Sequence, residues 1–205
     1  MRPRQAKRKS NRDGESAANL LDKLDGAEAA SVLKTLLDRH GELRSEAETI
    51  ARAILAEISP FSVADDVADA LLQFDYDDLN GRAGGQSWGY VGPDEAAGEL
   101  LDEALEPFVT DMKRYLEMGL EDQARQFCQG ILLGLYRVRD GGENDILGWV
   151  PDFPAEAAAD ALKVWSETGG TAREGAQAKK RRRRLSPDFV REHMPDWEWV
   201  LKPGH

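Results

Sequence analysis

The stretch QFCQGILLGLYRV, residues 126–138, is the most apolar part of the chain and decides the expected fold class. Its apolar side chains recur every three or four residues, which is the spacing of one face of an α-helix. Gly130 and Gly134 leave a flat strip on that helix, where a second helix backbone can come close. We expect this strip to pack in the core, with contact between two copies as the alternative. Cys128, on the apolar face, is expected to be a buried small hydrophobic residue.

Helical periods continue on both sides of this segment, and no run of alternating β-branched residues is long enough for a strand. The expected helices cover residues 20–40, 43–58, 62–72, 93–119, 121–139 and 154–168. The first three are short and joined by tight turns, which favours antiparallel packing. The sequence therefore predicts an all-α fold, a bundle or short array of antiparallel helical hairpins with disordered basic termini and linker.

Three local features refine this prediction. Ser62 and Asp65 have the spacing of a helix N-terminal cap. Pro107 lies inside an apolar stripe, which predicts a kink or two abutting helices. Residues 75–92 contain five closely spaced glycines, so no helix is expected there, and the acidic residues at the start of this stretch are expected to cap turns.

Charge divides the chain of 205 residues, whose formal net charge is −11, into zones. Residues 1–13 and residues 179–184 each hold six Lys or Arg, whereas residues 14–178 hold 13 Lys or Arg against 33 Asp or Glu. The expected organisation is a disordered basic arm at 1–16, a helical domain at 17–168, a basic linker at 169–185 and a short aromatic segment at 186–205. In that last segment Phe189, Trp197, Trp199 and Leu201 are expected to dock onto the body.

Several kinds of site are absent from the sequence. One cysteine excludes an internal disulfide and a Cys-based zinc site. No apolar run reaches the length that spans a bilayer and no secretory signal is visible, so we expect a cytoplasmic protein with no membrane contact. Phosphate-loop, dinucleotide and metalloprotease motifs are missing. No cofactor, no metal and no catalytic residue are predicted.

Two weak motifs have simpler explanations. Ser87 lies in a G-x-S-x-G string, but the hydrolase turn that uses this string needs a preceding strand and a partner histidine. A hydrolase reaction at Ser87 is therefore only a remote alternative. Glu95, Glu99 and Glu103 share one helix face, yet no Glu-x-x-His occurs, so a solvated acidic face is expected and not a di-iron site.

A set of small-residue motifs gives a further expectation. These are Asn80-Gly-Arg82-Ala-Gly, Gly89-Tyr90-Val, Pro93-Asp-Glu-Ala-Ala97, Glu106-Pro107 and Gly130-Ile-Leu-Leu-Gly134-Leu-Tyr136. Residues 20–165 resemble the α-helical regions of uncharacterised prokaryotic proteins, some of which carry a SWIM-type zinc finger. The chain lacks the Cys-x-Cys and Cys/His set of that finger, so the resemblance implies a helical module without zinc and without catalytic residues to transfer.

The leading functional hypothesis is a helical protein-interaction module that binds a protein partner or self-associates as a homodimer. Arg82, Trp88 and Tyr90 are its predicted binding residues, because aromatic and Arg side chains dominate binding hot spots. The alternative is that these side chains pin the 81–92 loop to the core. A second hypothesis is nucleic-acid binding through the basic arms at 2–12 and 179–184. Its predicted contacts are Lys179, Lys180, Arg181, Arg182, Arg183 and Arg184.

Overall fold

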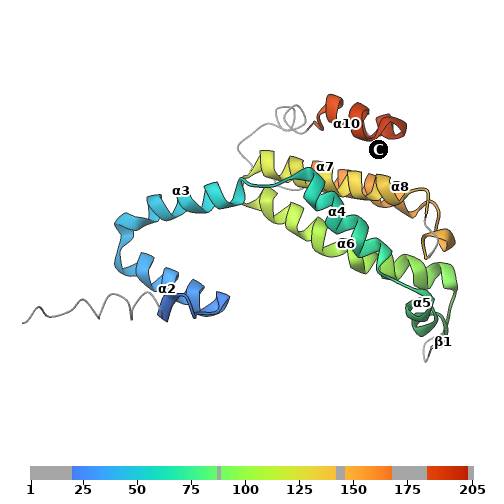
Figure 1. Cartoon of the computed structure of the whole chain (residues 1–205), viewed down its shortest axis with the longest axis horizontal. Coiled ribbons are helices and arrows are strands. Elements are labelled where there is room, and N and C mark those ends of the chain that lie inside the picture. The colour runs from blue at the N-terminus through green and yellow to red at the C-terminus, as the bar shows by residue number, and fades with distance from the viewer. Residues whose placement is uncertain (1–19, 87–88, 142–145, 168–183, 203–205) are drawn as a thin grey trace, which may run out of the picture. The chain divides into compact units, whose positions relative to one another are not determined.

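The computed structural model describes residues 20–86, 89–141, 146–167 and 184–202, which are mostly helical (Figure 1). This confirms the predicted all-α class with packed helices. The chain separates into two compact units, residues 1–54 and residues 55–205. The boundary falls within the last turn of a helix.

The first unit contains two helices that meet at an elbow. Helix α2 (Gly26–Arg39) begins at a capping box, in which Asp25 accepts from the Glu28 backbone and the Glu28 carboxylate accepts from the Asp25 backbone. It ends at His40, followed by the short 3-10 helix η1 (Gly41–Leu43) and by α3 (Arg44–Leu55). Neither α2 nor α3 buries a residue, so the antiparallel packing expected of the first short helices is wrong for this pair.

The second unit is built around the apolar helix identified in the sequence. Its elements are α4 (Pro60–Leu72), α5 (Tyr76–Arg82), β1 (Gly84–Gln86), β2 (Gly89–Val91), α6 (Pro93–Glu117), α7 (Glu121–Val138), η2 (Leu147–Trp149), α8 (Phe153–Glu167), α10 (Pro187–His193) and η3 (Pro195–Leu201). Helix α7 packs against α4, α6 and α8, and α6 also contacts α4 and α8 (Figure 1). The central position expected for residues 121–139 is confirmed.

Glycine in α7 allows α4 to come unusually close. A Cβ atom at Gly130 would lie 2.5 Å from Val63 Cβ and 2.9 Å from the Pro60 carbonyl oxygen. A Cβ at Gly134 would lie 2.7 Å from Val67 Cβ. Real Cβ atoms do not approach other atoms so closely, so only glycine fits at these two positions. The predicted core packing of the Gly130–Gly134 strip is confirmed within this chain.

The glycine-rich stretch is more ordered than expected. Asp75 caps α5 through a capping box with Asp78, so the predicted capping role of these acids is confirmed while the predicted absence of helix is wrong. The strands β1 and β2 then pair antiparallel, with Gly84 opposite Val91. Gly84 and Gly89 have φ of 107° and 155°, a conformation that glycine adopts without strain. Three residues per strand are too few to show a period of two in the sequence.

Two other local predictions are corrected. The α4 cap is Ser59, whose side chain accepts from the Ser62 backbone, and not Ser62 itself. Pro60 occupies the first turn of α4, where its missing N–H costs nothing. Helix α6 is continuous through Pro107, so the alternative of two abutting helices is wrong, while the alternative of a kink stays a prediction. Pro107 is exposed, so the carbonyl that it leaves without a helical partner can bond to water.

Candidate interaction surfaces

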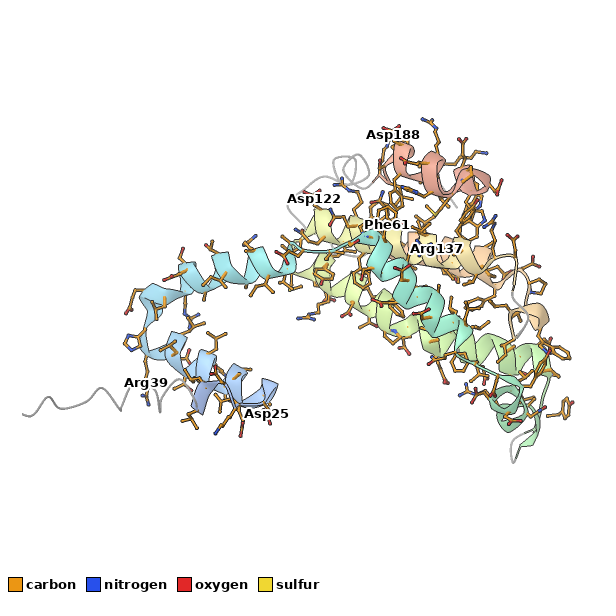
Figure 2. The ribbon with its side chains drawn as sticks, in the orientation of Figure 1. Asp25, Arg39, Phe61, Asp122, Arg137 and Asp188 are labelled. Atoms are coloured by element: carbon orange, nitrogen blue, oxygen red, sulfur yellow. The ribbon has the colours of Figure 1, made fainter. Side chains whose placement is uncertain are left out.

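The first unit displays several large apolar side chains that its own described helices do not bury. Seven large apolar side chains between residues 20 and 54 are exposed, namely Leu20, Leu21, Val32, Leu33, Leu36, Ile50 and Ile54. We call the last five, which lie on α2 and α3, the N-terminal stripe. Ile50 and Ile54 are 53% and 69% exposed. Both helices also carry charged side chains and neither buries a residue, so each one is amphipathic without a core of its own (Figure 2).

Charges around the N-terminal stripe are balanced. Residues 26–55 hold four Lys or Arg and five Asp or Glu, whereas residues 56–167 hold seven against 24. Arg44 donates to Asp38 across the elbow at 3.2 Å, and His40 Nδ1 lies 3.2 Å from the Glu42 carboxylate. The elbow is therefore a mixed-sign surface, unlike the strongly acidic residues 56–167.

The predicted binding residues of the 81–92 segment differ in exposure and in their contacts. The Arg82 guanidinium donates two hydrogen bonds to the Glu103 carboxylate, at 2.7 and 2.8 Å, and lies 3.6 Å from Glu99. The hydrogen bond from Arg82 lowers the pKa of Glu103 and raises the pKa of Arg82 itself. Arg82 thus ties the end of α5 to α6, which supports an anchoring role.

The other two predicted residues of this segment are less constrained by the structure. Tyr90 is 74% exposed on β2, as a binding residue would be. Trp88 lies outside the described residues. The three residues therefore do not form one described surface, and the choice between a binding loop and a core plug stays a prediction for Trp88.

The C-terminal segment packs onto the second unit as the aromatic residues suggested. Trp197 is buried, and its ring meets the Tyr136 ring edge-on at 5.4 Å. The Tyr136 hydroxyl donates to Asp196 at 2.9 Å, and Arg139 lies 3.3 Å from the same carboxylate. Burial, followed by the hydrogen bond to Asp196, raises the pKa of Tyr136. Leu185, placed in the predicted linker, is also buried, so docking begins before residue 186.

A second contact of the same segment lies on α4. The Phe61 ring is 5.0 Å from the His193 ring and 5.9 Å from the Phe189 ring, and the His193 and Phe189 rings meet edge-on at 4.8 Å. Phe61 is still 44% exposed. His193 is therefore a packing residue between aromatic rings.

The described residues give little support to the candidate catalytic, nucleic-acid-binding and metal-binding residues. Ser87 and five of the six basic residues at 179–184 lie outside them, and Arg184 is exposed. Cys128 is completely buried, which confirms its predicted burial, and burial raises the pKa of its thiol. No group of His, Cys, Asp and Glu in the described part could hold a metal ion.

One acidic pair shows an environmental effect. Partial burial in α6, and then the nearby Asp160 carboxylate of α8, raise the pKa of Asp102. Both groups are carboxylates on the exposed sides of two packed helices. Two carboxylates alone do not indicate a reaction. The pair is an electrostatic cost of packing α6 against α8.

Comparison with known protein families, with curated proteins and with solved structures found no match. The resemblance to helical regions near SWIM-type fingers therefore stays a prediction. Among the described helices, none is both long and apolar enough to cross a membrane.

Proposed function

We propose that this protein is a protein-interaction module that binds through the N-terminal stripe. The observation that supports this is the pair α2 and α3, which are amphipathic and yet bury no residue. Exposed apolar side chains gathered on one element mark an association surface more often than scattered ones do. The capping box at Asp25 and Glu28 favours helix formation at the start of α2.

The size of the stripe is compatible with modest affinity. Complete burial of a Val, Leu or Ile side chain is worth roughly 1.5–3 kcal/mol, and the five side chains of the stripe are each exposed by about half. Burying what remains would contribute on the order of 5 kcal/mol before the cost of association is subtracted.

Binding through Tyr90 on β2 remains a second predicted surface of the same module. It is smaller, since Arg82 is engaged with Glu103 and one exposed aromatic ring is all that the described hairpin offers. We therefore place the main contact on the N-terminal stripe.

The test replaces three stripe residues by a polar helix former, as Leu36→Gln, Ile50→Gln and Ile54→Gln together. The matched control carries Lys34→Gln and Arg52→Gln on the polar side of the same helices. Full-length chains are immobilised and challenged with purified chain and, separately, with nuclease-treated lysate, and circular dichroism checks their helix content. We expect the triple variant to lose specific capture and the control to keep it. Equal capture by the wild type and the triple variant would refute the proposal.

A further inference from the structure

We infer that the partner of the N-terminal stripe is a second copy of this chain, with α3 of one copy packed antiparallel on α3 of the other. The inference rests on the proposed function and specifies its partner. It is argued from the order of large and small side chains along η1 and α3, from the residues that flank them, and from the charge contrast between the two units.

The apolar face along η1 and α3 holds one small residue, Ala47, among three large ones. Leu43, Ala47, Ile50 and Ile54 are spaced by four, three and four residues, which is the spacing of a helix–helix seam. In an antiparallel pair Ala47 lies opposite Ile50 of the second copy, and Leu43 lies opposite Ile54. The small side chain of Ala47 then meets the large side chain of Ile50. A parallel pair would place Ala47 on Ala47 and leave a gap between the helices.

The flanking residues permit close approach. In the antiparallel register Arg44 lies beside Ala51 of the second copy, and Glu46 lies beside its Ala53. No charge is placed next to a like charge at the edge of the seam. The alanines leave room for the aliphatic stems of Arg44 and Glu46 to cover the apolar side chains.

The α2 helix adds to the same surface. The twelve residues of α3 alone form a short seam, and helices of this length depend on packing for stability. Because α2 joins α3 through η1, it leaves the seam at Leu43, the end where Ile54 of the second copy lies. Val32, Leu33 and Leu36 of α2 therefore begin near that end and can extend the contact.

The charges distinguish a second copy from a basic partner. A strongly basic protein would be attracted to residues 56–167, with their large excess of Asp and Glu, and not to the nearly neutral α2–α3 region. Two copies meet at α3 through apolar side chains while their acidic remainders repel each other. Added salt screens that repulsion, so self-association is expected to be unchanged or stronger at high ionic strength.

The test uses cysteine cross-linking between two variants of the full-length chain, Ala47→Cys and Ile50→Cys. Cys128 is completely buried and does not interfere with the native protein. The antiparallel pair predicts that a mixture of the two variants forms a disulfide-linked dimer several-fold faster than either variant alone. The matched control mixes Glu48→Cys with Arg52→Cys, on the polar side, and is expected to form no disulfide-linked dimer under the same oxidant, although the copies still associate through the seam.

The outcomes separate the inference from the proposed function. Cross-linking of each single variant with itself, as fast as in the mixture, would overturn the antiparallel arrangement in favour of a parallel one. No cross-linking in any combination, with a monomer by sedimentation at about 100 μM chain, would overturn self-association. In that case the triple glutamine variant tests the proposed function. If that variant no longer captures protein from the lysate, the N-terminal stripe is still an interaction surface, and its partner is a protein other than a second copy.

Salt dependence supplies an independent check. The dissociation constant of the dimer is measured at about 50 mM and about 500 mM NaCl, which spans strong and weak screening. We expect it to stay constant or fall. A rise of tenfold or more would show that ion pairs hold the copies together, contrary to the apolar seam.

Discussion

The α4–α7 contact and the N-terminal stripe are made from the same ingredients and end in opposite states. Both place large aliphatic side chains beside small residues on one helix face. In the first, Gly130 and Gly134 admit Val63 and Val67 of α4, and the contact is closed within the chain. In the second, Ala47 and Ile50 face no described partner, and Ile50 remains 53% exposed.

The difference shows what a helical period can and cannot establish. A period of three to four residues marks the apolar face in both cases, but it does not identify the surface that covers the face. A strip of glycines stabilises a helix contact only where the backbone of a second helix packs closely against it. Alanine and isoleucine tolerate several neighbours, including a copy of the same helix. The following predictions test the closed contact first.

The largest expected effect comes from filling the glycine strip. The double change Gly130→Ala and Gly134→Ala puts Cβ atoms within 2.9 Å of backbone carbonyl oxygens of α4, which can yield only if the helices separate. Overpacking of this kind costs roughly 1–3 kcal/mol per site. We expect a lower urea midpoint and a lower melting temperature for the double variant.

The matched control for this prediction is Gly98→Ala in α6, where an added Cβ meets nothing within 4 Å. The same substitution should there be stabilising, by up to about 1 kcal/mol, because alanine favours helix. Opposite signs at the two places would confirm the close approach. A double variant as stable as the wild type would contradict it.

The second prediction concerns the docked C-terminal segment. Trp197→Ala removes a buried indole that packs on Tyr136, a change that costs about 3 kcal/mol in a closed site. We expect the loss to appear as undocking of residues 185–201, read as faster amide exchange there with little change in α7. Trp149→Ala, at a 46% exposed position, is the control and should cost less than about 1 kcal/mol. Uniformly faster exchange over the whole second unit would show that the segment is not a separate docking element.

The smallest expected effect is electrostatic and depends on pH. The folded state raises the pKa of Asp102, so the unfolded chain releases this proton at lower pH, and stability falls as pH rises through the folded pKa. Asp102→Asn should therefore stabilise the protein at pH 7, by no more than about 0.5 kcal/mol, the range of surface substitutions. Below about pH 3 the difference should vanish, since Asp102 is then protonated in both states.

The acid partner offers the check on this explanation. Asp160→Asn removes the nearby like charge and should shift stability in the same direction, while Glu106→Gln on the exposed side of α6 should not. Chemical unfolding at pH 3 and pH 7 measures all three variants. A stabilisation by Asp102→Asn that is independent of pH would point to packing instead of charge.

Several features of the fold could be predicted from residues alone because their causes are local. Asp75 caps a helix with its own side chain, Pro93 begins α6 where its missing N–H is not needed, and Gly119 ends it at a φ of 72°. Cys128 could be called buried because its helix is apolar on that face. Trp197 docks because a large apolar ring near a body of helices gains more by burial than by exposure.

Other features could not be predicted in this way. The β1–β2 hairpin is too short for a period, and it forms because glycines with positive φ let the chain reverse between α5 and α6. Arg82 has the composition of a hot-spot residue, and only the position of Glu103 on α6 shows that it is engaged. The N-terminal stripe was visible as a helical period, but a period predicts a buried face whether or not the chain supplies a cover.

The sequence by itself determined the all-α class, the approximate bounds of α6, α7 and α8 and the acidic charge of the second unit, because caps, periods and charges act over one or two turns. The tertiary structure alone decided which faces are closed. Closure needs two elements far apart in the chain to match in shape, as Gly130 and Gly134 match Val63 and Val67. It also showed that α2 and α3 do not bury each other's apolar faces, because two amphipathic helices form a core only where their chain path lets them pack.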